Sequence, residues 1–289
     1  MQSRPEQWQR AFQEDGFVIV EDVLDPAALA RLREGLDRIT ADPDGLPSRL
    51  QAKIFLERDH VRNNPQWYAG ALAPEDCGQA VRQVADLALF GPAFATLICY
   101  PPLLDVLEAL FVSPEFSFHA MQGRPKAARV GNGISNGAYH RDTPFEAFTS
   151  ANTVEAVLCL DALSEANGGT TFLRGSHRVA DAEAARPCWR EVPPGQADLS
   201  ARVAARCPAG AGVFFSSKLL HAAGHNRSEH PRRTIFSEWV GPGVLPTSPA
   251  RNPYEGLRPR SRDPLYQKQV RMTFPHLFGG SEPAANHGI

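Results

Sequence analysis

Apolar positions recur with helical spacing in the first part of the chain. The clearest case is residues 26–40, where the apolar positions are Leu29, Leu32, Leu36 and Ile39. Asp25, which is followed by a proline, is typical of the residue that precedes a helix, so a helix is expected to begin there. A second amphipathic helix is predicted over residues 5–15, which place Trp8 and Phe12 on one face.

The pattern changes between and beyond these helices. Residues 16–24, GFVIVEDVL, are rich in β-branched side chains and predict a strand. Residues 41–80 give a mixed pattern with loops. Residues 78–111 are interpreted as helical again, in pieces broken near Gly91 and Pro101.

After Pro114, short apolar runs alternate with clusters of Gly, Asn and Pro. The runs are FSFHAM, EAVLCLDAL, TTFLRG, AGVFFSS and RTIFSEWVG. This spacing predicts a sandwich or barrel of short strands, and so an α+β protein with a mainly β core. No internal repeat or linker divides the chain, so a single domain is expected over 1–289, with a helical part about 1–112, a core about 113–242 and a C-terminal loop or tail about 243–289.

Composition and charge narrow the class of protein. A 289-residue chain with 43% hydrophobic content and a net charge of −2 is typical of a soluble globular protein and gives no reason to expect nucleic-acid or membrane partners. The N-terminus is polar, and no apolar run is interpreted as a membrane span. The five cysteines are scattered without a CxxC pair, which favours free thiols in a reducing compartment, so a cytoplasmic location is expected.

Candidate chemistry begins with His140 and Asp142 in the sequence GAYHRDTPF. On a strand, residues two apart project from the same face, so the imidazole and the carboxylate would lie together. A turn-stabilising ion pair is the alternative. A third metal ligand is expected at His221, which follows the apolar run 212–216. Two histidines and one carboxylate on one side of a metal leave three positions open, the arrangement suited to Fe(II) and oxygen chemistry.

An arginine pair follows this histidine. Residues of one strand alternate sides, so only one of Arg232 and Arg233 is expected to point inward. A buried guanidinium requires an anionic partner, and a carboxylate can accept two parallel hydrogen bonds from it. The distal carboxylate of 2-oxoglutarate fits this requirement.

Four stretches of the chain resemble the phytanoyl-CoA dioxygenase family of Fe(II)/2-oxoglutarate oxygenases. They are EDGFVIVEDVLDPAALARLREGL, YHRD, ANGGTTFLRGSHR and GVFFSSKLLHAAGHNRSEHPRRT, spread over residues 14–240. The resemblance implies a double-stranded β-helix (jelly roll, cupin-like) core with packed N-terminal helices. It also implies that His140, Asp142 and His221 bind iron, that Arg232 binds 2-oxoglutarate, and that Arg233 is the second choice.

Two further residues are candidates for contacts with the co-substrate. The Thr170 hydroxyl is expected to donate to the same carboxylate as the arginine, with an ordinary strand threonine as the alternative. Gln122 is expected near the iron-bound end of the co-substrate, with a solvent-facing glutamine as the alternative. The cluster of Arg124, Lys126 and Arg129 is interpreted as a solvated face, or as a surface that receives an anionic substrate.

The predicted function is an Fe(II)- and 2-oxoglutarate-dependent dioxygenase that uses O₂ to hydroxylate an unactivated C–H bond of a small molecule. Because the resemblance includes Asp142, where halogenating relatives have a small residue, it implies oxygenation rather than halogenation. A zinc-dependent isomerase or hydrolase on the same barrel and a catalytically silent binding protein are the alternatives. Arginines in the tail favour an anionic substrate, such as an amino-acid derivative or another carboxylate; they are Arg251, Arg258, Arg260 and Arg262.

Overall fold

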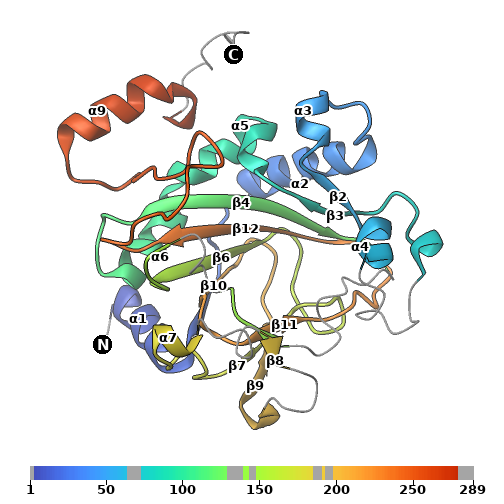
Figure 1. The fold of residues 1–289 in the computed structure, drawn as a ribbon, viewed down its shortest axis with the longest axis horizontal. Helices are drawn as coiled ribbons and strands as arrows, with labels where there is room; N and C mark the ends of the chain where they lie inside the picture. Colours follow the sequence, from blue (N-terminus) through green and yellow to red (C-terminus); the bar gives the residue numbers. More distant parts are fainter. Residues whose placement is uncertain are drawn as a thin grey trace.

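Two antiparallel sheets face each other in the computed structural model, and helices cover the outer side of the larger sheet (Figure 1). The structure describes residues 3–63, 73–128, 139–142, 148–184, 191–192 and 198–278. This is the mixed α/β jelly-roll architecture that the sequence predicts.

The larger sheet has seven strands in the order β1-β10-β6-β12-β4-β3-β2. Their bounds are β1 Phe17–Val20, β2 Ile54–Leu56, β3 Val81–Val84, β4 Ser117–Lys126, β6 Thr153–Cys159, β10 Gly212–Ser216 and β12 Arg232–Val240. The smaller sheet has five strands in the order β8-β5-β11-β7-β9. Their bounds are β5 Tyr139–His140, β7 Thr170–Leu173, β8 Glu191–Val192, β9 Arg202–Ala204 and β11 His221–Ala223. Every strand-like run after Pro114 is therefore confirmed as a strand.

Alternation along the strands separates two buried layers. On β12, Ile235 and Trp239 belong to the core between the large sheet and the helices, whereas Phe236 packs with the apolar cluster between the sheets. The stacked rings of Phe17 and Phe172, 4.6 Å apart between centroids, join the two sheets directly. Even-numbered residues of β12 consequently face the interior of the jelly roll.

The helices that cover the large sheet begin where the sequence predicts. Helix α1 spans Arg4–Asp15, and α2 spans Pro26–Ala41 with Asp25 at its N-cap, where the carboxylate accepts a hydrogen bond of 2.8 Å from Ala28 N. Leu36 of α2 is fully buried and lies over Gly123 of β4. A Cβ at Gly123 would lie 2.9 Å from a methyl carbon of Leu36, so the absence of a side chain lets the helix approach the strand closely.

The region 41–111 differs in part from the prediction. Its elements are α3 Ser48–Gln51, β2, α4 Glu57–Asn63, η2 Pro74–Cys77, β3, η3 Leu87–Phe90, α5 Pro92–Ala95, η4 Thr96–Cys99 and α6 Pro101–Phe111. The helical interpretation is wrong for Val81–Val84, because these residues extend the large sheet beside β4 as β3. The run 92–111 is long and apolar enough to cross a membrane by length and composition alone, contrary to our expectation, yet many of its large side chains lie in the core.

The C-terminal part contains more order than the predicted loop. It forms α9 Pro264–Thr273 and η7 Pro275–Phe278, while the shorter α7 Asp181–Ala184 and η6 Leu199–Ala201 lie in the connections of the core. Three of the four tail arginines contact acidic residues near α6 rather than a site: Arg258 binds Glu115, and Arg260 and Arg262 lie beside Glu108. Their charges serve to attach the tail.

The contact of α2 with the sheet gives a stability prediction. Leu36→Ala should lower the free energy of unfolding by about 2–5 kcal/mol, because the cavity left above β4 cannot be refilled. Chemical denaturation measures the change. Leu265→Ala is the matched control, since Leu265 is 79% exposed and its loss should change the stability by at most about 0.5 kcal/mol. Equal effects of the two substitutions would contradict this view of the core.

Candidate active site

His140 and His221 are neighbours across the smaller sheet. Strand β11 pairs with β5 so that the Cα atoms of the two histidines are direct partners, and side chains at paired positions point to the same face. Their ring centroids lie 4.2 Å apart. Two imidazoles that are 81 residues apart in the chain therefore converge in the interior of the jelly roll.

Asp142 completes the group just after β5. Its carboxylate oxygens lie 3.1 Å from Nε2 of His221 and 3.6 Å from Nε2 of His140. The intervening Arg141 is buried on the other side, where its guanidinium donates hydrogen bonds to the carbonyls of Lys218 and Ser176. The predicted sharing of a face by His140 and Asp142, opposite Arg141, agrees with this geometry.

The tautomer of His221 suits metal binding. Nδ1 donates its proton to the Leu219 carbonyl at 3.0 Å, so Nε2, which lies 3.1 Å from Asp142, is the nitrogen available to a metal. Without a metal, the two groups polarise each other. Burial opposes the charge on each, but their mutual attraction outweighs it, raising the pKa of His221 and lowering the pKa of Asp142.

The ligand atoms of His140, Asp142 and His221 all lie within 4.8 Å of one another, close enough to hold one ion. A carboxylate and two neutral imidazoles fit a divalent first-row metal. His225 and His230, which follow His221 closely in the sequence, stay outside this group. His230 is exposed, and the pKa of His225 is lowered by burial and by the charges of Lys126 and Arg227.

One wall of the site is aromatic. The Phe215 ring lies 4.7 Å from the His221 ring, and the Phe172 ring lies 6.5 Å from it, measured between centroids. Both phenylalanines are fully buried. They hold the imidazole in place and make its surroundings apolar, which strengthens electrostatic interactions at the ligand atoms.

Arg232 lies buried at one end of the interior face. Its guanidinium donates to the Thr234 hydroxyl at 2.9 Å and to the carbonyls of Asn167 and Gly168 at 3.3 Å. Within the described part of the chain, no carboxylate lies within ion-pair distance of it. Burial lowers its pKa to about 10, so the group remains a cation without a close counter-ion.

Arg233 has a different set of partners. Its guanidinium binds both carboxylate oxygens of Asp161, at 2.9 and 2.8 Å, and lies 2.6 Å from Asp37 of α2. These contacts satisfy its charge and join β12 to the helical layer. Of the two arginines, Arg232 is the one whose guanidinium faces the interior without a carboxylate partner among the described residues.

Lys126 is a second cation beside Arg232. It is the Cα partner of Arg232 on β4, and its ammonium group donates to the carbonyls of Gly168 and Gly224. The expectation of a solvated face is wrong for this residue, which is 1% exposed, and for Arg124, which shares the inward row of β4 with it and lies over the Phe236 ring. Burial lowers its pKa well below the ordinary value. Arg129 lies outside the described residues.

A glycine turn supplies the carbonyls between these cations. Gly168 has a φ of +74°, and a Cβ there would lie 2.4 Å from the Gly224 carbonyl oxygen, so only glycine fits. Thr170 follows at the start of β7 and is the Cα partner of Ala223, two residues from His221. Its side chain therefore shares the inward face of His221, and the part of the chain that the structure describes offers its hydroxyl no hydrogen bond.

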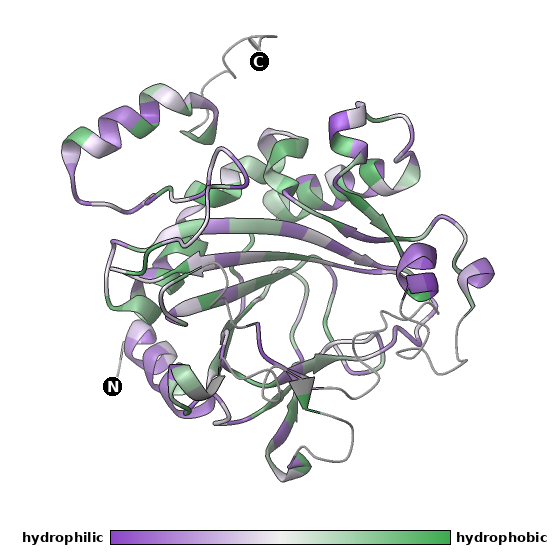
Figure 2. Ribbon diagram, in the orientation of Figure 1, coloured by the Kyte–Doolittle hydropathy of each residue, from purple (hydrophilic) through white to green (hydrophobic). Residues whose placement is uncertain are grey.

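The charge of the side chains on the interior face changes from positive at one end to negative at the other. In register, Lys126 and Arg232 form a cationic end, and Glu155 of β6 and Glu238 of β12 are direct partners at the other end. Along β4 and β12, hydrophilic and hydrophobic segments are mixed (Figure 2). Gln122 lies between the ends, partner to Phe236, and lines a cavity of about 270 Å³. That placement puts it inside, on the acidic side of the site.

Sequence reasoning missed Lys126, Glu155 and Glu238 as interior groups. A signal was present, because a charged residue within an apolar strand run, as in EAVLC and FSEWV, faces either solvent or a site. Choosing between these two faces requires the sheet register, which the sequence does not give.

The fold and the triad together define a class: jelly-roll metalloproteins with a two-histidine, one-carboxylate centre. Residues 12–234 match the phytanoyl-CoA dioxygenase (PhyH) family. This chain belongs to that family of Fe(II)/2-oxoglutarate-dependent oxygenases.

Similar proteins agree with this assignment. The chain is 26% identical over 275 residues to the dioxygenase hkm4 of Aspergillus hancockii, covering 90% of this chain and 79% of that protein. Among solved structures, the 2-oxoglutarate-dependent epimerase SnoN from nogalamycin biosynthesis is 20% identical with a TM-score of 0.60, covering 86% of this chain and 85% of its own. EctD from S. alaskensis with bound Fe is 19% identical with a TM-score of 0.60, covering 99% and 88%.

The geometry of the triad predicts which histidine is needed for metal. His221→Ala should weaken binding of Fe(II) or Co(II) by about 100-fold or more, because one of three ligand atoms is lost. Anaerobic isothermal titration calorimetry measures the affinity. His230→Ala should bind metal as the parent protein does, and an equal loss in both variants would place the ligand elsewhere.

Proposed function

We propose that the protein is an iron- and 2-oxoglutarate-dependent hydroxylase of a small molecule, with His140, Asp142 and His221 as the iron ligands. One observation carries this proposal: the triad and the unpaired cation Arg232 share one buried interior. An enzyme that binds both iron and a dicarboxylate needs a three-residue metal site and a cation for the carboxylate in the same cavity.

Arg232 and Lys126 are proposed to bind the distal carboxylate of 2-oxoglutarate. The two cations share the Gly168 carbonyl as an acceptor, so a carboxylate between them would gain charge-assisted hydrogen bonds from both. The Thr170 hydroxyl would add a third donor. When bound, iron and 2-oxoglutarate together activate O₂ for attack on a C–H bond.

The residues around the triad orient and shield rather than react. Phe172 and Phe215 keep His221 in position and exclude water from its ring. The Leu219 carbonyl holds the proton of His221 on Nδ1, so that Nε2 stays available. Gln122 is proposed to donate from β4 toward the bound co-substrate or substrate.

A zinc isomerase or hydrolase would have no use for the cationic end of the interior, and a silent binding protein would not need an intact triad. A different reaction at the same type of metal centre, such as the epimerisation carried out by SnoN, is distinguished from hydroxylation by the mass of the product. Hydroxylation adds one oxygen atom to the substrate, whereas epimerisation leaves its mass unchanged.

Removal of the carboxylate ligand tests the metal chemistry. Asp142→Ala should reduce succinate formation from 2-oxoglutarate to the background rate, because the two histidines alone hold iron weakly. Succinate is measured by mass spectrometry with and without Fe(II). Asp181→Ala, which removes an acid paired with Lys218, is the control and should retain turnover. Full turnover by Asp142→Ala would refute the assignment of the ligands.

Removal of the cation tests the co-substrate site. Arg232→Ala should raise the KM for 2-oxoglutarate by about 10- to 100-fold, the effect of losing charge-assisted hydrogen bonds. The Arg232→Lys variant should recover part of the loss. Arg233→Ala should lower the melting temperature through loss of its ion pairs while leaving the KM within about twofold. A larger KM effect in Arg233→Ala would reverse the roles of the two arginines.

A further inference from the structure

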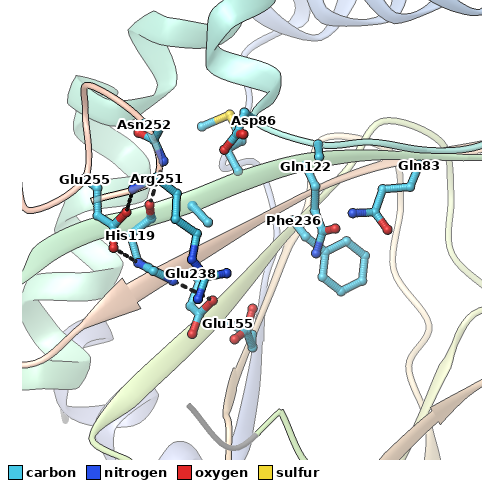
Figure 3. Close-up of a pocket in the computed structure, with 13 residues that line it drawn as sticks. Gln83, Asp86, His119, Gln122, Glu155, Phe236, Glu238, Arg251, Asn252 and Glu255 are labelled. Carbon is cyan, nitrogen blue, oxygen red and sulfur yellow. Dashed lines mark hydrogen bonds and ion pairs between the residues drawn. The ribbon is translucent and has the colours of Figure 1, made fainter. Parts of the chain in front are cut away.

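The cavity at the acidic end of the interior has a lining of unusual charge. It measures about 270 Å³ and is bounded by residues of β3, β4, β6 and β12 and by the segment 251–255 (Figure 3). Its acidic residues are Asp86, Glu155, Glu238 and Glu255, against the single arginine Arg251. Such a lining disfavours an anionic ligand.

Most of these acids already have a nitrogen beside them. Asp86 lies 2.7 Å from the ammonium group of Lys53. His119 lies between two glutamates, 2.8 Å from Glu255 and 3.8 Å from Glu238. Burial keeps the pKa of His119 low, so it contributes little positive charge to the cavity.

Glu155 is the exception. It is only 6% exposed, it lines the cavity, and within the described residues its carboxylate makes neither a hydrogen bond nor an ion pair. Its Cα partner on β12 is Glu238, another carboxylate, so the two groups repel each other across the strands. Burial and the charge of Glu238 raise the pKa of Glu155 against the opposing charge of Arg124. Burial and the charge of Asp142 raise the pKa of Glu238 to about 8. A buried acid without a counter-ion either keeps its proton or binds a base that takes it.

A metal ion does not account for this group. Among the residues that the structure describes, His140, Asp142 and His221 are the one set whose ligand atoms lie close enough together for an ion. The acids around the cavity form no second set. An organic amine is a ligand that suits such an acid, because it can take the carboxyl proton and stay as an ammonium ion beside the carboxylate.

Glu155 also lies near the metal centre. Its Cα partner on β10 is Phe215, whose ring packs against His221 at 4.7 Å. Neighbouring strands are about 5 Å apart, so Glu155 lies next to the strand position whose ring packs against His221. The charge of Asp142 acts on both Glu155 and Glu238.

We propose that this cavity is the substrate site and that the substrate carries a basic amine, which Glu155 binds with help from Glu238, so that a carbon a few bonds away faces the metal. The reaction of this substrate rests on the proposed function, whereas the binding of the amine does not depend on it. It replaces the anionic substrate expected from the sequence. The cationic end of the interior is left to the co-substrate, and the acidic end selects the amine.

The test uses three probes that share a cyclohexyl ring and differ in the charge of a one-carbon polar group: cyclohexylmethylamine, cyclohexylmethanol and cyclohexanecarboxylate. Calorimetric titration of the full chain, both metal-free and loaded anaerobically with Fe(II) and 2-oxoglutarate, should show the amine binding at least about tenfold more tightly than the alcohol or the acid. Equal affinities, preference for the acid, or no measurable amine binding at millimolar concentration would overturn the proposal.

Glu155→Gln should abolish the preference for the amine. Glu34→Gln, the same change on the exposed face of α2, should leave the preference unchanged. Without ligand, Glu155→Gln should also raise the melting temperature by about 2–4 °C, because the repulsion with Glu238 is relieved. An unchanged amine preference in Glu155→Gln, or a lower melting temperature, would show that Glu155 has a structural role instead.

The two proposals can fail separately. If the metal-free chain prefers the amine but no succinate forms with Fe(II), the proposed oxygenase reaction is wrong and the amine site stands. If succinate forms but the amine is not preferred, the substrate inference is wrong and the oxygenase stands.

Discussion

The pairing of β11 with β5 is the constraint on which the rest of the site depends. It places His221 directly opposite His140, and Asp142 reaches both imidazoles because the chain continues for two residues beyond the paired position. A shift of one residue in this register would turn His221 to the outer face, where Ala222 and Thr171 lie now. The convergence of the two histidines of the candidate metal centre is therefore a consequence of strand pairing, and Asp142 joins them from the residues just after β5.

The larger sheet makes an equal contribution through its own register. Strands β4, β6 and β12 place their inward residues in rows, so that Lys126 and Arg232 meet at one end and Glu155 and Glu238 at the other. The ion pairs of Arg233 with Asp161 and Asp37 hold β12 against α2 on the opposite side. An outward arginine thus fixes the strand that presents the inward one.

The sequence predicted those features that depend on local spacing. The helix after Asp25 and the strands after Pro114 follow from periodicity and capping, and the shared face of His140 and Asp142 follows from a spacing of two. The prediction of His221 as a metal ligand and of Arg232 as the co-substrate ligand rests on the longer stretch GVFFSSKLLHAAGHNRSEHPRRT, which resembles the family. Strand β3 was not predicted because Arg82 and Gln83 interrupt its apolar pattern. Its residues form a strand because they pair with β4.

Features that depend on distant partners could not be predicted. Lys126 is buried because carbonyls 42 and 98 residues away accept its hydrogen bonds. The alternation of side chains along a strand predicts that one of Arg232 and Arg233 points inward, but it does not predict which one. The answer lies in Asp37 and Asp161, which are 196 and 72 residues from Arg233. Burial of Glu155 likewise follows only once β6 is known to lie between β10 and β12.

The separation of charge along the interior has a consequence for how this protein can diverge. Glu238 lies on β12 with Arg232 and Glu155 lies on the neighbouring β6, and among the described residues neither acid shares a hydrogen bond with the cationic end. Substitutions at these positions can change which molecules are accepted while iron and dicarboxylate binding stay as they are. A lineage built on this scaffold could acquire new specificities in single steps, without passing through an inactive ancestor.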